Sequence, residues 1–142
     1  MRHVSVVVGL LILNFAVGTI YCQSVPVDLC PKRMTGLKYP RLAHFAGVQG
    51  KVELEAIVSR DGGVEEVHTI SGPPLLAEWM KEALKEWLFT NCSQISVPCR
   101  YKVTFVFELM TGSCEMSQCP NEVQIDLPVI TIRSQQARAI IN

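Results

Sequence analysis

Hydrophobic and polar residues alternate along two stretches of the chain, as they do in strands with one buried face. In residues 51–58 the apolar positions are Val52, Leu54, Ala56 and Val58. In residues 100–109 the alternating positions are Tyr101, Val103, Phe105, Phe107 and Leu109. Each set falls on one side of an extended chain. The pattern therefore predicts two half-buried strands.

A third strand is expected over residues 64–70, directly after the sequence Asp61-Gly62-Gly63. Val64 and Val67 lie an odd number of residues apart, so both face the core only if a bulge near Glu65 and Glu66 shifts the strand by one residue. An Asp-Gly pair between alternating runs is a strong hairpin signal. A calcium or phosphate loop is the alternative, but its ligand spacing is absent here. We interpret the glycine-rich point as a turn.

Helical spacing predicts an amphipathic helix over residues 75–88, with a charged outer side. Its apolar face is formed by Leu76, Met80, Ala83 and Trp87, and is widened by Trp79 and Leu84. A shorter helix is expected around residues 42–46, bounded by Gly47 and Gly50. The element order predicts a two-layer α+β domain: a small antiparallel sheet of about three strands with two helices on one face.

The N-terminal residues 1–24 have the features of a secretory signal. Arg2 gives a positive start, residues 4–20 are uncharged and largely apolar, and Cys22 and Ser24 stand at the positions before a cleavage site. The alternatives are an uncleaved membrane anchor and a lipoprotein with Cys22 as acceptor. Each of these places the remaining chain outside the cytoplasm. Residues 25–38, which contain two prolines and a glycine, are expected to form an irregular lead-in.

The six cysteines fit an oxidising compartment. Cys92 and Cys99 flank a short connection, and Cys114 and Cys119 close a small loop. These two pairs are the disulfide candidates, which leaves Cys30 free or paired with another chain once Cys22 is removed. We expect no metal, because there is no CxxC motif and no histidine close to a cysteine in the sequence. His44 and His68 are expected at the surface or as capping residues.

Charge and motifs narrow the class of function. Removing Arg2 with the leader leaves 12 basic and 13 acidic residues, so we expect no nucleic acid as a partner. No recognised catalytic motif is present, and we expect neither enzymatic activity nor a cofactor. An exported cysteine-dependent enzyme is the alternative from another class.

Between residues 39 and 109 the chain resembles the C-terminal domain of TonB-type energy transducers. The resemblance rests on a series of short motifs in a fixed order. These are Tyr39-Pro40, Ala43, Gly47, Gly50-Lys51-Val52, Asp61-Gly62, Val64, Ser71-Gly72, Leu75-Leu76, Ala83, Trp87-Leu88-Phe89 and Phe105-Val106-Phe107-Glu108-Leu109. The resemblance implies a small antiparallel sheet with two helices on one face, located in the bacterial periplasm or secreted.

The resemblance also implies how such a domain acts. It binds an extended peptide of an outer-membrane receptor or another envelope protein by strand addition at a sheet edge. By analogy that edge is residues 100–109, and the contact residues are Arg100, Tyr101, Lys102, Val103 and Thr104. Strand exchange could also give a homodimer.

Two departures from a full transducer leave alternatives open. The chain has no long proline-rich spacer, and Ser5 and His3 are not one helical turn apart within the apolar segment. A detached binding module fits better than a minimal, inner-membrane-anchored transducer, and membrane contact is expected only if residues 1–24 are retained. The cysteine-containing tail, 110–142, lies outside the resemblance and holds one further candidate strand, 127–134. If that strand pairs with 100–109, the docking edge is occupied and a structural role is favoured.

Overall fold

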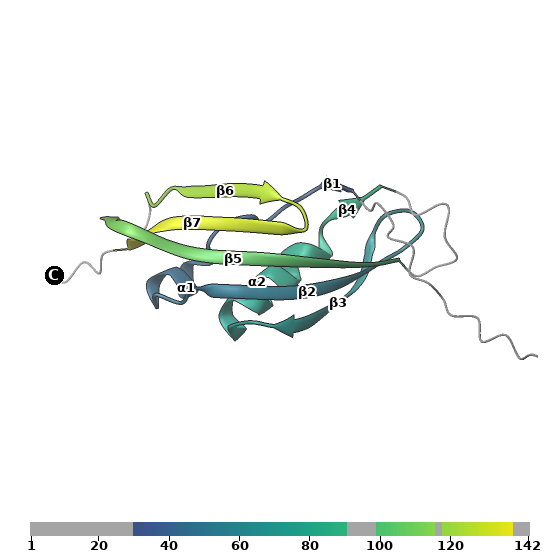
Figure 1. Ribbon diagram of the computed structural model, residues 1–142, viewed down its shortest axis with the longest axis horizontal. Coiled ribbons are helices and arrows are strands. Elements are labelled where there is room, and N and C mark those ends of the chain that lie inside the picture. The colour runs from purple at the N-terminus through teal and green to yellow at the C-terminus, as the bar shows by residue number, and fades with distance from the viewer. Residues whose placement is uncertain (1–29, 91–98, 116–117, 138–142) are drawn as a thin grey trace, which may run out of the picture.

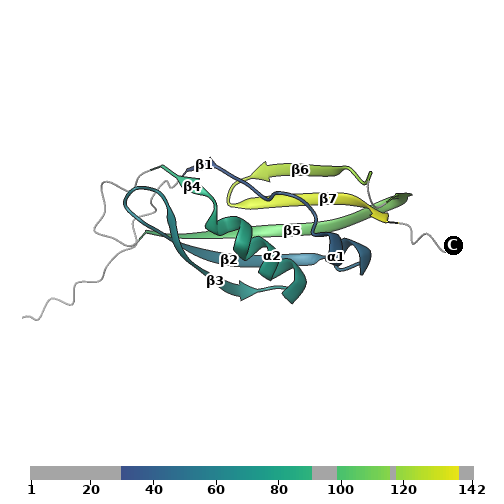
Figure 2. The same cartoon turned by 180° about the vertical axis from the view of Figure 1, so that it is seen from behind.

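The computed structural model describes residues 30–90, 99–115 and 118–137. Its elements in chain order are β1 (Pro31–Arg33), α1 (Arg41–Phe45), β2 (Gly50–Val58), β3 (Val64–Ser71), α2 (Pro74–Lys85), β4 (Leu88–Phe89), β5 (Cys99–Cys114), β6 (Asn121–Asp126) and β7 (Val129–Ala137). Both helices lie on the same side of the main sheet (Figures 1 and 2). The predicted two-layer α+β architecture is therefore confirmed.

The main sheet has five strands in the order β3-β2-β5-β7-β6. Neighbouring strands are antiparallel except β5 and β7, which run parallel. β1 and β4 form a separate antiparallel pair. The expectation of about three antiparallel strands was too small, because the tail contributes β6 and β7 to the same sheet.

The glycine-rich point is the turn of the β2–β3 hairpin. The backbone N–H of Ser59 donates to the Gly63 carbonyl at 2.8 Å, and Gly62 has a φ of +93°. Asp61 also serves the turn: its Oδ1 accepts from the Ser59 hydroxyl, and from the Gly63 N–H at 3.3 Å. The hydrogen bond from Ser59 is the main cause that lowers the pKa of the Asp61 carboxyl. The turn interpretation is confirmed.

The predicted bulge in the second strand is also present. Ile57 pairs with Glu66 and Val58 with Val64, so Glu65 is the extra residue. The bulge restores the alternation that the sequence breaks, and Val67 is buried as a result.

The core fills the space between the sheet and the helices. The predicted apolar positions of β2 are fully buried, as are Phe105 and Phe107 of β5. Helix α2 buries the expected side but ends at Lys85, three residues earlier than predicted. The N–H groups of Glu86 and Trp87 bond to Ala83 and Leu84, which tightens the last turn and directs Trp87 into the core. Largest among the buried apolar side chains are Trp87, Phe105, Phe107, Leu54, Leu76 and Met80.

Ordered structure extends beyond the expected domain, 39–109, on both sides. β5 continues to Cys114, and the tail strand β7 places Ile130 and Ile132 in the core at 0% exposure. The lead-in is not wholly irregular either, since it contains β1, which pairs with β4. In both places a hydrogen-bonding partner distant in sequence extends the ordered structure.

Candidate protein-binding surface

The strand expected to form the sheet edge is only partly free. β7 pairs with β5 from Thr104, opposite Val129, onward, and the Thr104 N–H donates to the Pro128 carbonyl at 2.9 Å. The expectation that 100–109 is an edge strand is therefore wrong from Thr104 on. The physical reason is burial: Ile130 and Ile132 reach the core only if β7 lies beside β5.

The beginning of β5 does not pair with β7. Within the described residues, the stretch from Arg100 to Val103 pairs with β2 on one side and with no strand on the other. Backbone groups of successive strand residues point to opposite sides. Since the N–H of Thr104 points toward β7, those of Arg100 and Lys102 point to the open side, and those of Tyr101 and Val103 toward β2.

Ion pairs connect the start of β5 to β2. The side chain of Glu55 on β2 is 13% exposed, and its Oε1 accepts from Arg100 Nη1 at 2.8 Å, with Lys102 Nζ at 3.9 Å from Oε2. Arg100 and Lys102 are themselves well exposed, at 64% and 73%. Two cations against one carboxylate leave a net positive charge beside the open backbone groups.

The opposite side of the same stretch packs on the core. Val103 is buried, and the Tyr101 ring lies 4.9 Å from the Phe89 ring between centroids. The Tyr101 hydroxyl is buried and has no hydrogen-bond partner among the described residues. Burial, with a smaller contribution from Cys30, raises the pKa of this phenol. Tyr101 and Val103 therefore fix the strand, whereas Arg100 and Lys102 face outward.

Two further strands have an open side within the described part of the chain. β3 pairs with β2 alone, and β6 pairs with β7 alone. All six residues of β6 are exposed. β6 was not expected from the sequence as an edge strand, because its pairing depends on the position of β7.

An apolar groove of about 760 Å³ lies between α1, α2 and the start of β6. Leu42, Leu75 and Trp79 line it, and they are 74%, 46% and 39% exposed. The Lys38 ammonium lies 5.5 Å from the Trp79 ring. Trp79 was expected to widen the buried face of the helix, and that expectation was wrong, because α2 buries Ala77 instead. The groove was not expected from the sequence, where its apolar lining is spread over Leu42 on α1 and Leu75 and Trp79 on α2.

Two of the four cysteines in the described residues form a disulfide, and the other two do not pair within these residues. Cys114 and Cys119 form the predicted disulfide. Cys92 lies outside the described residues, so its pairing with Cys99, which is buried, stays a prediction. Cys30 is exposed.

The two internal histidines differ. His68 is exposed, as expected. His44 is buried at 5% exposure, and its Nε2 lies 2.5 Å from the Gln135 carbonyl oxygen. The expectation of a surface or capping role for His44 was wrong, because α1 packs that side of the helix against the end of β7.

Across residues 30–90, 99–115 and 118–137, none of the helices has the length and apolar character needed to cross a membrane. Residues 1–24, for which a secretory signal is predicted, lie outside the described residues.

Comparison with known proteins points to one family. The family model for the C-terminal region of the Gram-negative bacterial TonB protein matches residues 35–109. Among solved structures, the solution NMR structure of the Pseudomonas aeruginosa TonB C-terminal domain is similar, with 23% identity, a TM-score of 0.48, and coverage of 58% of this chain and 88% of that one. None of the curated proteins matches the chain. The family match spans more than half of the sequence, and the chain therefore belongs to the TonB C-terminal domain family, whose members are transport-associated protein-interaction modules.

Proposed function

We propose that this protein is an exported, stand-alone TonB-like module that binds an extended peptide of an outer-membrane receptor or another envelope protein. The binding mode is strand addition, and the role is in TonB-dependent transport. The observation that carries the proposal is the open stretch of β5 between Arg100 and Val103. Family membership supports a periplasmic, non-enzymatic binding role.

The peptide would lie beside the start of β5, on the same side of β5 as β7. It would pair with the residues before Thr104, where the pairing with β7 begins. The N–H and C=O groups of Arg100 and Lys102 would complete its backbone ladder. Because the N–H of Thr104 is already bonded to Pro128, Thr104 can offer its side chain but not that donor. The open ladder is short, so side-chain contacts must add to the affinity.

Charge indicates which peptide would bind best. Arg100 and Lys102 share the single carboxylate of Glu55. A peptide with an acidic residue beside its extended segment would provide a second partner for these cations. Contacts of this kind mainly raise the association rate and weaken with salt.

A proline variant tests strand addition. Lys102→Pro removes an N–H that points to the open side, where proline is tolerated in a sheet. Thr69→Pro is the matched control: β2–β3 pairing directs the N–H groups of Glu66 and His68 toward β2, so that of exposed Thr69 points to the other open side. The probes are synthetic peptides covering the N-terminal periplasmic segments of outer-membrane receptors from the same bacterium.

We expect Lys102→Pro to weaken peptide binding at least tenfold in titration calorimetry, while circular dichroism stays unchanged. Thr69→Pro should bind as the natural protein does. Equal binding by both variants, or loss with Thr69→Pro alone, would contradict docking on β5. Val103→Pro is less suitable, because its N–H points toward β2 and its loss would disturb the sheet itself.

A second candidate is a purely structural role, and the pairing of β7 with β5 favours it. In that case the tail covers the edge permanently, and no receptor peptide binds at any salt concentration. The third alternative, a minimal anchored transducer, depends on residues 1–24. An intact mass from the membrane fraction that includes these residues would favour it, and a soluble protein lacking them would favour the exported module.

A further inference from the structure

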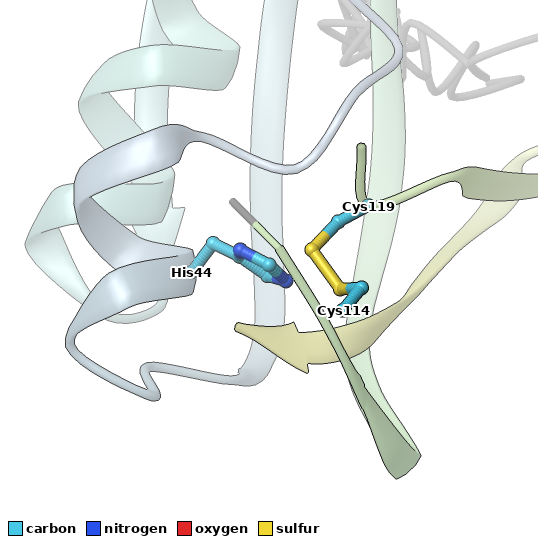
Figure 3. A group of neighbouring side chains, drawn as sticks. All are labelled: His44, Cys114 and Cys119. Atoms are coloured by element: carbon cyan, nitrogen blue, oxygen red, sulfur yellow. A yellow bond between two sulfur atoms is a disulfide. The ribbon is translucent and has the colours of Figure 1, made fainter. Parts of the chain in front are cut away.

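Three potential metal ligands from distant parts of the chain meet at one end of the domain. His44 comes from α1, Cys114 is the last residue of β5, and Cys119 precedes β6 (Figure 3). One ligand atom from each lies within 4.8 Å of the other two. The two sulfur atoms are joined as a disulfide, toward which the imidazole of His44 is directed (Figure 3).

We propose that reduction of the Cys114–Cys119 disulfide forms a zinc site, in which two thiolates and the His44 imidazole bind the cation. This site is independent of the peptide-binding surface proposed above. It makes the disulfide and the metal mutually exclusive states of the same three residues.

The ligand spacing fits this assignment after a small movement. Zinc bonds of about 2.3 Å to sulfur and about 2.0 Å to nitrogen place tetrahedral ligand atoms roughly 3.5–3.8 Å apart. The histidine nitrogen and the two sulfur atoms all lie within 4.8 Å of one another, so an adjustment of about 1 Å reaches this separation. The Cα atoms of the two cysteines are 5.2 Å apart, so rotation of the side chains can open the sulfur pair once the bond is broken.

Contacts with Tyr39 and Gln135 fix the His44 ring in the disulfide-bonded protein. The ring is buried, it packs edge-on against Tyr39 at 5.3 Å between centroids, and Nε2 contacts the Gln135 carbonyl at 2.5 Å. A backbone carbonyl that fixes the ring is a common outer-shell partner of zinc-bound histidine. A carbonyl oxygen can only accept a hydrogen bond, so Nε2 carries the ring proton while this contact is made. In this tautomer the lone pair that would bind zinc lies on Nδ1.

Charge favours a divalent, sulfur-preferring cation. Two thiolates carry two negative charges, which Zn²⁺ neutralises, and a neutral centre suits a site where His44 is buried and both cysteines are only partly exposed. Calcium and magnesium prefer oxygen ligands. His44 and Cys119 both line the apolar groove, from which water can reach the fourth coordination position.

The redox step requires a dithiol reductant, such as a thiol–disulfide exchange protein of the same compartment. The reductant supplies two electrons and two protons, the sulfur–sulfur bond of Cys114–Cys119 breaks, and the reductant leaves as its own disulfide. Zinc then displaces the two thiol protons. A disulfide with a purely structural role would require none of these steps.

The test is a titration of the full chain with zinc chloride against a zinc indicator. The protein is reduced with a phosphine, desalted without oxygen and compared with its oxidised form. We expect one tight zinc equivalent in the reduced protein that is lost in Cys114→Ser/Cys119→Ser. His44→Gln should weaken this equivalent at least about tenfold. His68→Gln, which alters an exposed histidine, is the matched control and should leave the affinity unchanged.

Two results would overturn the proposal. One is an equal zinc equivalent in Cys114→Ser/Cys119→Ser, which would assign the metal to the other cysteines. The other is an unchanged affinity in His44→Gln. If His44→Gln does not fold, X-ray absorption of the zinc-loaded natural protein decides: two sulfur ligands and one imidazole support the site, and sulfur ligation without imidazole contradicts it.

Discussion

The Gly62 carbonyl accepts a hydrogen bond from the Phe89 N–H at 2.8 Å, and a Cβ on Gly62 would lie 2.0 Å from the Phe89 carbonyl oxygen. The hairpin turn therefore lies directly against β4. Glycine is required here for two reasons. A side chain would clash with Phe89, and the φ of +93° is one that other residues rarely adopt.

Gly62→Ala should destabilise the protein by about 2–4 kcal/mol, since it adds backbone strain and a clash with backbone atoms that cannot move aside. Gly47→Ala is the control, because Gly47 has a φ of +66° with no atom within 4 Å of the added Cβ, and it should cost about 1 kcal/mol. Urea unfolding followed by circular dichroism measures both. Equal losses would mean that the contact with Phe89 does not constrain the turn.

Trp87 connects the core to the lead-in. It is fully buried, and its Nε1–H donates to the Thr35 carbonyl at 2.9 Å. Trp87→Phe should cost about 2–3 kcal/mol, because it leaves a cavity and an unpaired carbonyl. Trp79→Phe should cost less than about 1 kcal/mol, since Trp79 is partly exposed and loses mainly its contact with Lys38. A reversed order of the two unfolding midpoints would contradict this assignment.

The tail strand β7 contributes Ile132 to the core, and a substitution at this residue measures that contribution to stability. Ile132→Ala should cost about 2–5 kcal/mol, as expected for a fully buried isoleucine. Ile125 on β6 is 44% exposed, and Ile125→Ala should lower the free energy of unfolding by less than about 1 kcal/mol. If both changes have the same small effect, the tail contributes nothing to the core.

Local patterns predicted the parts of the fold that local physics determines. Alternation located β2 and the start of β5, and the odd spacing of Val64 and Val67 located the bulge at Glu65. The Asp-Gly pair located the turn. These features depend on residues close to one another in sequence, so the sequence displays them directly.

The features that were missed or left open depend on contacts between distant residues. Pairing of the tail strand with residues 100–109 was an open alternative, because no local pattern indicates which side of which strand it will join. His44 was misplaced for the same reason, because its partner, Gln135, is far along the chain. Of the candidate binding residues, Arg100 and Lys102 keep an open backbone side, whereas the N–H of Thr104 is bonded to Pro128 of the tail.

Tyr39 should make the stability of the protein depend on alkaline pH. Its ring lies in the core against Phe107, its hydroxyl donates to the Val48 carbonyl at 2.7 Å, and burial raises its pKa to about 12. In the unfolded chain a tyrosine pKa is about 10. The folded state thus favours the neutral phenol, and this contribution is complete below about pH 10 and disappears as the pH rises to about 12.

At pH 8, Tyr39→Phe should cost about 1 kcal/mol through the lost hydrogen bond. The difference in urea midpoint between the natural protein and Tyr39→Phe should then narrow between about pH 10 and 12. A difference that stays constant over this range would show that Tyr39 ionises as readily in the folded protein as in the unfolded chain.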